Sequence, residues 1–551
     1  MKTKVYLLGI FLFLLSPTFA QQVSLETAQR VANIFLQNNV SSAMRSASAT
    51  STTTSNASVI KPIGKVAQSP VMYAVSQDSV WVLVSADERV APILAYSDAN
   101  AGAFPNEEDM PDGMVALLEW YEQQIEYLRD STNITTIHEE WKKLDMISLT
   151  TVGEDVVSPL LDKRGKNRWK QSGNNGYSFP DIHHSYNKFC PIDENGLNTI
   201  VGCVGVAMGQ LMWYWQWPHV AIVKDDDGHS LIREYNWKIM PGELTNNTSI
   251  SSVDMVANLL HDAGVSVNMN YGINSSGASP NNIAEALINT FSYYSDELIH
   301  REDYTSSDWI TLLKHNLQQG YPILYGGRDI DNNGHRFIID GYDSSNRFHI
   351  NYGWGRTPTY FTLTTIVDTL YEFHLSQSAV LNIHPIYPDC MPLEISDNEP
   401  WSKYFILQNG GGINIGNKII ASDQVGIIYS GDYVKLTSGF RAKAGSKIHI
   451  AIRDQHCAEA TSSAPQRIVP RSSSSSADNS DTSDEVATSN ALENIESEMI
   501  QSTAIYTISG QLLQTIEGGQ RDAAHLPNGM YILQHRMSDG STRTEKIANN
   551  K

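Results

Sequence analysis

The chain has 551 residues, and at ~150 residues per domain this length predicts three or four domains. Hydrophobic residues make up 41% of the chain and charged residues 18%, which excludes a fully disordered or coiled-coil protein. The formal net charge of −21 argues against nucleic acid or an anionic membrane surface as a partner.

Residues 1–20 have the pattern of a signal peptide. Lys2 and Lys4 precede an apolar run, Val5–Leu15, and small and polar residues follow up to Ala20. The run is shorter than the ~20 residues that span a bilayer. We therefore expect a secreted protein with no membrane span in its mature form; an N-terminal membrane anchor is the alternative.

Residues 21–150 are predicted to form one α+β unit. A helix is expected from Ser24, strands over 73–75 and 80–85, and an amphipathic helix from Met114 onwards. The apolar stripe of that helix is interpreted as core. No nucleophile and base stand out as a pair in this part of the chain.

Residues 151–385 contain the candidate nucleophile. The stretch GCVGVAMGQLMWY lacks proline and charge, which predicts a buried helix with Cys203 in its first turn. Free N–H groups and aligned peptide dipoles at that position stabilise a thiolate. The alternative is a cysteine that only packs as a small apolar residue.

A base for this thiol is predicted in NNGHRFIIDGYD, where His335 starts a strand after a loop. An imidazole there can form an ion pair with Cys203. Gly334 lets the backbone, and a substrate, come close. The alternative is a structural histidine at a strand edge.

Three further residues complete the predicted site. In FHINYGWG, strand alternation separates Asn351 from Tyr352, and the Asn351 amide oxygen is expected to accept a hydrogen bond from the imidazole. Trp354 would cover that bond. Gln171 is the candidate side-chain donor of an oxyanion hole, together with the N–H of Cys203. No Cys/His cluster has metal-ligand spacing, so no metal or cofactor is expected.

The order Gln–Cys–His–Asn resembles the papain-like cysteine peptidases, and most closely the streptopain family. The matching blocks are WKQSGNNGYSF, GCVGVAMGQLMWYWQWP, DAGVSVNMNYG, NNGHRFIIDGYD and HINYGWG. The resemblance implies an α+β, papain-like peptidase domain over 151–385, with Cys203 as nucleophile, His335 as general base and acid, and Asn351 with Trp354 beside the histidine. Tyr352 stands in a block that departs from the family pattern, so it is expected to alter substrate contacts.

The same resemblance extends to the N-terminal unit. VWVLVSADERVAPILAYS is similar to the family's propeptide, and VVSPLLDKRGK to the start of the mature enzyme. Residues 21–150 are thus expected to be an α+β propeptide that inhibits the enzyme within the same chain until it is cut off near residues 145–158.

Small all-β modules are predicted after the peptidase domain. Residues 386–460 alternate in short segments, and Cys390 and Cys457 bracket them. A disulfide between these two would stabilise the module by on the order of 4 kcal/mol, and two free thiols are the alternative.

The C-terminal end changes character twice. Residues 461–500 are rich in Ser and Asp and predict a disordered linker. Residues 501–551 are predicted to be a β-sandwich. The blocks YTISGQLL, LPNGMYILQ and TEKI resemble the C-terminal sorting domain of proteins exported by type IX secretion. The resemblance implies that the type IX secretion machinery is a partner and that the protein can be retained at the outer cell surface. An ordinary β-sandwich is the alternative.

The sequence therefore predicts a secreted cysteine endopeptidase made as a zymogen, with proteins or peptides as substrates. Two other functions remain open: a surface adhesin or binding protein with a relic peptidase fold, and an acyltransferase on the same fold.

Overall fold

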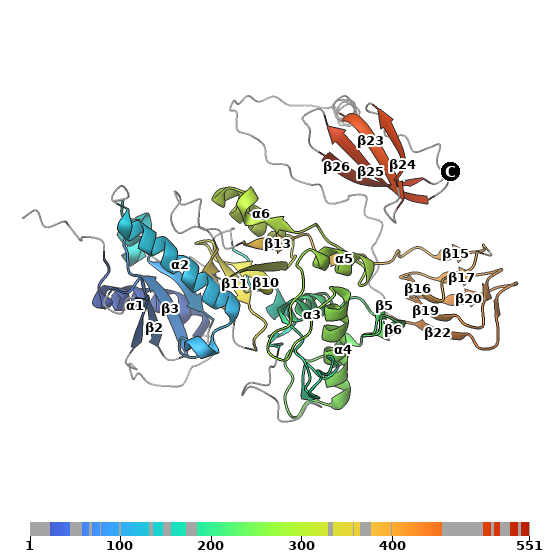
Figure 1. Cartoon of the computed structure of the whole chain (residues 1–551), viewed down its shortest axis with the longest axis horizontal. Helices are drawn as coiled ribbons and strands as arrows, with labels where there is room; N and C mark the ends of the chain where they lie inside the picture. The colour runs from blue at the N-terminus through green and yellow to red at the C-terminus, as the bar shows by residue number, and fades with distance from the viewer. Residues whose placement is uncertain are drawn as a thin grey trace, which may run out of the picture. The chain divides into compact units, whose positions relative to one another are not determined.

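A computed structural model describes residues 22–44, 58–65, 69–77, 79–98, 101–131, 136–146, 156–171, 184–328, 334–355, 358–363, 376–397, 399–453, 500–507, 512–517, 529–537 and 542–549. The predicted signal peptide and nearly all of the predicted linker lie outside these residues. The chain divides into two compact units, residues 1–462 and 463–551 (Figure 1).

Six α-helices are described: α1 (Leu25–Met44), α2 (Asp112–Asp130), α3 (Cys203–Trp215), α4 (Ile250–Ser266), α5 (Asn282–Asn289) and α6 (Ser306–Gln318). The strands of the first unit up to residue 385 are β1 (Val59–Ile63), β2 (Met72–Gln77), β3 (Val80–Ser85), β4 (Ile93–Ser97), β5 (Val220–Lys224), β6 (Ser230–Glu234), β7 (Tyr293–Tyr294), β8 (Ile299–His300), β9 (Ile323–Arg328), β10 (Gly334–Tyr342), β11 (Arg347–Asn351), β12 (Thr359–Thr362), β13 (Ser378–Val380) and β14 (His384–Pro385).

The N-terminal region, residues 22–146, forms an antiparallel sheet of β1–β4 between two helices. Strand β3 is buried along its whole length because α1 covers one face of the sheet and α2 the other. Val31 and Phe35 of α1 meet Val82 and Val84, whereas Trp120 of α2 belongs to the cluster that contains Trp81 and Leu83. The predicted helices and strands of this region are confirmed.

One ten-stranded sheet joins the N-terminal region to the rest of the first unit. Its order is β1-β2-β3-β4-β12-β11-β10-β9-β13-β8, and the joint is the antiparallel pair β4·β12, where Ser97 faces Thr359 and Ala95 faces Phe361. The N-terminal region therefore attaches through main-chain hydrogen bonds as well as side-chain packing.

Helix α3 lies in the core of the central region. Ten of its thirteen residues are buried, which explains why the sequence is apolar on all sides of this helix. It packs on one face of β10, where Ile338 joins its cluster, while α2 packs on the opposite face against Phe337 and Ile339. The α+β class predicted from the sequence is confirmed.

A stack of parallel strands follows, residues 389–453. It consists of β15 (Leu393–Ile395), β16 (Tyr404–Asn409), β17 (Ile413–Ile415), β18 (Ile419–Ile420), β19 (Val425–Ser430), β20 (Val434–Leu436), β21 (Arg441–Ala442) and β22 (Lys447–Ile452). These pair as β15-β17-β20, β16-β19-β22 and β18-β21, all parallel.

The stack confirms an all-β module but shows a repeat that the sequence analysis missed. Aligned residues recur after 20 to 22 positions, as in Leu393, Ile413 and Val434. Apolar residues of each turn of the chain pack against those of the next turn, as in solenoid proteins. Cys390 is disulfide-bonded. Cys457 lies outside the described residues, so its pairing with Cys390 stays a prediction.

The parallel stack rests on the hairpin β5–β6 of the central region. Val220 packs with Ile427 and Tyr429, and Glu234 accepts hydrogen bonds from the Tyr429 hydroxyl at 2.5 Å and from Arg453 at 2.8 Å.

The second unit contains one antiparallel sheet in the order β24-β23-β25-β26, built from β23 (Ile500–Thr507), β24 (Leu512–Glu517), β25 (Gly529–Met537) and β26 (Thr542–Asn549). Within the described part of the chain, none of the helices has the length and apolar character needed to cross a membrane.

Candidate active site

Cys203 is the first residue of α3, as predicted. The preceding residue, Gly202, caps the helix with φ +79°, a conformation that favours glycine, and a Cβ there would lie 3.0 Å from the carbonyl oxygen of Ser276. No acidic residue stands in the first turn to oppose a negative sulfur. The helix start therefore presents the thiol to unpaired N–H groups.

His335 lies next to this thiol. Burial raises the pKa of Cys203, but hydrogen bonding to His335, the charge of that imidazole, and the main-chain N–H and charge of Arg336 outweigh burial and lower it. A lowered pKa converts a weakly ionised thiol into a ready nucleophile. The structure thus brings together the predicted nucleophile and base, although 132 positions separate them in the chain.

The orientation of the imidazole differs from the prediction. His335 Nε2 lies 3.0 Å from the main-chain oxygen of Tyr352, to which it donates. The other ring nitrogen, Nδ1, is buried and has no hydrogen-bond partner among the described residues, so it is left for the Cys203 thiol. The acceptor that fixes the ring is therefore a backbone carbonyl, and the predicted bond from His335 to the Asn351 side chain is wrong.

Asn351 instead holds that carbonyl in place. Its Oδ1 accepts from the N–H of Gly353 at 3.1 Å and from Gln210 Nε2 at 3.1 Å, and its Nδ2 donates to Asn167 at 2.9 Å. The Gly353 N–H and the Tyr352 carbonyl belong to the same peptide unit. Asn351 therefore orients His335 through one peptide group, because fixing the N–H of that unit also fixes its C=O.

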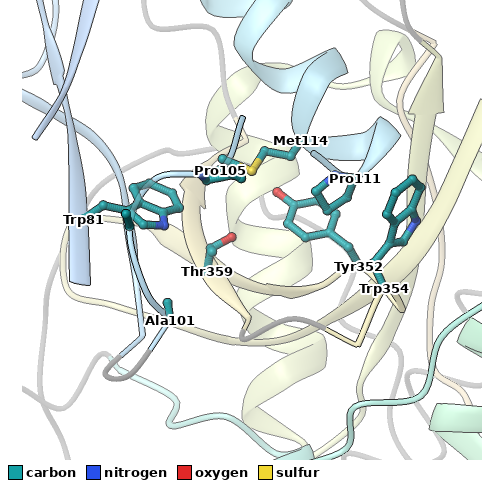
Figure 2. A pocket seen from close by; sticks show the side chains of 9 residues that line it. Trp81, Ala101, Pro105, Pro111, Met114, Tyr352, Trp354 and Thr359 are labelled. Atoms are coloured by element: carbon teal, nitrogen blue, oxygen red, sulfur yellow. The ribbon is translucent and has the colours of Figure 1, made fainter. Parts of the chain in front are cut away.

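Trp354 and Tyr352 surround the imidazole. The Trp354 ring stands edge-on to it, with ring centres 6.3 Å apart at 74°, and the Tyr352 ring centre lies at 6.4 Å. Figure 2 shows both side chains lining a pocket with Pro111, Met114 and Trp81 of the N-terminal region. Trp354 lies beside the imidazole, but the hydrogen bond that the sequence predicts it to cover does not form, and the contact of Tyr352 with substrate stays a prediction.

Gln171 and Gly334 lie at the rim of this site. Lys170 pairs with Trp354 in an isolated antiparallel bridge, so the half-buried Gln171 directly follows the segment that flanks Trp354. Gly334 is exposed and pairs with Arg328 at the start of β10. Their roles at the oxyanion and the substrate stay predictions.

Helix α2 covers His335. Gly113, Ala116 and Leu117 of α2 line a pocket together with Gly326 and His335 of the central sheet. A Cβ on Gly113 would lie 2.8 Å from His335 Cδ2 and 3.1 Å from the Phe337 ring. The N-terminal region thus touches the candidate base directly.

A buried histidine that the sequence analysis did not select also ties the N-terminal region to the central sheet. His349 Nδ1 lies 2.5 Å from Asp340, and Nε2 lies 3.4 Å from Asp98, which follows β4. Burial lowers the pKa of His349, but the charge of Asp340 and the hydrogen bonds to Asp340 and Asp98 outweigh it and raise the pKa to about 10.

This pairing predicts a pH-dependent stability. Because the folded-state pKa of His349 is raised, its contribution is complete below the unfolded value near 6.5 and is lost as the pH rises towards 10. The effect should be on the order of a few kcal/mol. We expect the difference in melting temperature between wild type and His349→Gln to shrink from pH 6.5 to pH 10. His229→Gln, at an exposed position, is the control, and a constant difference would contradict this assignment.

One group in the described residues has the composition of a metal site. Ligand atoms of Asp225, Asp227 and His229 lie within 4.8 Å of one another in the turn between β5 and β6. Asp225 accepts hydrogen bonds from the main-chain N–H groups of Asp227 and His229, so the turn itself accounts for the cluster.

Comparison with known families agrees with this geometry. Residues 181–361 match the model of the Peptidase C10 family, and residues 20–125 match the Spi protease inhibitor. Both candidate catalytic residues fall in the first match, and the residues of α2 that cover His335 fall in the second.

Individual relatives are similar over the same region. The thiol protease/hemagglutinin PrtT of Porphyromonas gingivalis is 29% identical over 50% of this chain and 31% of its own length. Streptopain of Streptococcus pyogenes is 28% identical over 55% of this chain and 78% of its own length. Among solved structures, a fragment of prointerpain A of Prevotella intermedia matches with 24% identity and a TM-score of 0.45, over 59% of this chain and 98% of that chain.

The chain thus spans about a third of PrtT and more than three quarters of streptopain. The matched residues, the buried helix that carries Cys203 and the imidazole beside it agree: residues 181–361 form a domain that matches the Peptidase C10 family of cysteine peptidases, and a domain similar to the Spi protease inhibitor precedes it.

Proposed function

We propose that the protein is a secreted cysteine endopeptidase that is made as a zymogen. The observation that carries the proposal is the contact between an ionisable thiol at a helix start and an imidazole fixed by a backbone carbonyl. Such a pair provides both the nucleophile and the proton carrier that peptide hydrolysis requires.

The reaction follows from these positions. Cys203 sulfur attacks the peptide carbonyl, and the negative charge that develops on oxygen is stabilised by the Cys203 N–H and, in our proposal, by Gln171. His335 donates its proton to the leaving amine. It then takes a proton from water, which hydrolyses the thioester and releases the thiol.

The N-terminal region is proposed to act as an inhibitory propeptide. Helix α2 lies against His335, and β4 extends the central sheet. Removal of this region requires a cut between its end at residue 146 and the segment that begins near residue 156. Residues 147–155 of the predicted cleavage range lie outside the described residues.

A peptide epoxide that reacts with thiols tests the proposed function. We expect the processed protein to be labelled on Cys203 and to lose its peptidase activity in proportion to the label. The buried Cys190 serves as an internal control, because burial raises its thiol pKa and makes it unreactive. Loss of activity with the label on another cysteine would overturn the assignment.

An adhesin with a relic peptidase fold is not favoured, because such a protein would be free to lose the contacts of Cys203 and His335. An acyltransferase would use the same residues, and incubation with an added amine separates the two functions: a peptidase yields mainly free acid, a transferase mainly amide.

Export is proposed from the ends of the chain. The N-terminal 20 residues have signal-peptide character, and the C-terminal sheet of β23–β26 contains the blocks that resemble a type IX sorting domain. Retention at the outer surface or release after removal of that sheet would follow.

A further inference from the structure

Arg336 is a buried arginine beside the proposed nucleophile. Its side chain is 6% exposed, and its guanidinium donates to the carbonyl oxygen of Ser378 at 3.0 Å and to the Ser378 hydroxyl at 3.1 Å. Among the described residues, no carboxylate forms an ion pair with it. A buried cation held only by neutral oxygens is costly, and this cost calls for a compensating negative charge.

The strand geometry directs Arg336 to the side of α3. Side chains alternate along β10, so Arg336 shares a face with Ile338, which packs in the cluster of α3, whereas Phe337 packs on the side of α2. Arg336 directly follows His335 in β10, on the side of the sheet that packs against the helix that begins at Cys203.

A glycine provides the space for the guanidinium. Gly326 is the residue opposite Arg336 on β9, and Ser378 is opposite Gly326 on β13, so the three lie in a row across the sheet. A Cβ on Gly326 would lie 3.0 Å from both Cζ and Nε of Arg336. The Arg336 side chain therefore extends across the sheet over the backbone of Gly326 and reaches Ser378.

We propose that Arg336 is a positioning residue whose buried charge acts as a second cation, beside the imidazole of His335, to hold Cys203 as a thiolate. The proposal rests on the peptidase function proposed above and deepens it. The charges agree with this arrangement: burial lowers the pKa of Arg336 to about 10, and the negative sulfur of Cys203 opposes that lowering. The thiolate is the missing counter-charge.

The test measures thiol ionisation rather than hydrolysis. The full-length chain is alkylated with iodoacetamide between pH 5 and 9.5, and the modification of the Cys203 peptide is followed by mass spectrometry. For Arg336→Met we expect the midpoint of the profile to rise by about one pH unit, so that alkylation at pH values well below the wild-type midpoint slows about tenfold while the rate at high pH is unchanged. Arg336→Lys keeps the charge and should stay close to wild type.

A matched control is available in Arg301, which is 2% exposed and also donates to a main-chain oxygen and a serine hydroxyl. Arg301→Met removes an equally buried guanidinium and should leave the profile of Cys203 unchanged. Arg336→Gln offers a second neutral replacement that can still form a hydrogen bond with Ser378. The test therefore does not depend on whether the Arg336→Met protein folds correctly.

The proposal is overturned if the neutral variants at residue 336 have the wild-type profile, or if Arg336→Lys shifts as far as Arg336→Met. A wild-type thiol that alkylates only at high pH would instead contradict the proposed ion pair with His335. The two failures are thus distinguishable.

Discussion

Cys203→Ala is expected to slow peptide hydrolysis by at least about 10⁴-fold, and His335→Ala by a similar factor. The reason is that the two side chains act as one unit: without the sulfur there is no thioester, and without the imidazole the thiol keeps its proton and the leaving amine receives none. The double variant should therefore be no slower than the slower single variant. The measurement is kcat/KM on a peptide substrate for purified, processed protein.

The control for this pair is Cys190→Ala. Cys190 is a free, buried cysteine that packs in the same core cluster as α3, and burial raises the pKa of its thiol. Its replacement should leave kcat/KM within a few-fold of wild type. Additive losses in the double variant would show that Cys203 and His335 act independently and would refute the proposed mechanism.

The nucleophile and its helix could be predicted because composition alone determines their surroundings. A stretch of 13 residues with no charge and no proline has to be buried, and a cysteine at its start then lies at a helix N-terminus. His335 and Trp354 were accessible through the blocks that resemble a known family. The antiparallel strands that carry them follow from alternation and from their flanking turns.

The acceptor that orients His335 could not be predicted in the same way. The acceptor is a main-chain carbonyl, and every residue has one, so no residue type marks the position. The sequence points to Asn351 because its side chain can accept a hydrogen bond. In the structure, its Oδ1 accepts that bond from the N–H of Gly353 and not from the imidazole. Sequence reasoning identified the right segment and assigned the contact to the wrong atom.

Arg336 and the parallel stack were missed for other reasons. Arginine is almost never fully buried, and nothing in the sequence next to His335 marks Arg336 as a buried cation. In the stack, the repeat of 20 to 22 residues keeps only the inward-facing apolar positions similar, such as Ile413 and the partly buried Val434, while the exposed ones vary. Short alternating segments then favour antiparallel strands, although each of them pairs in parallel with the next turn of the chain.

Gly113→Val should weaken the packing of the N-terminal region against the active site. The first added atom alone would lie 2.8 Å from His335 Cδ2, closer than a Cβ can approach, and Phe337 blocks the other direction at 3.1 Å. Because Gly113 stands in the first turn of α2, the helix has to move away from β10. We expect the intact, uncut chain to react with the peptide epoxide at Cys203 at least about tenfold faster than wild type.

The processed enzyme separates this effect from damage to the catalytic residues. Once the N-terminal region has been cut off and removed, residue 113 is absent, so the variant and wild type should have the same kcat/KM. Gly277→Ala is the matched control, because a Cβ at Gly277 meets no atom within 4 Å. An uncut Gly113→Val chain that stays as unreactive as wild type would mean that α2 covers His335 without restraining it, and that the inhibition resides in other contacts, such as the pairing of β4 with β12.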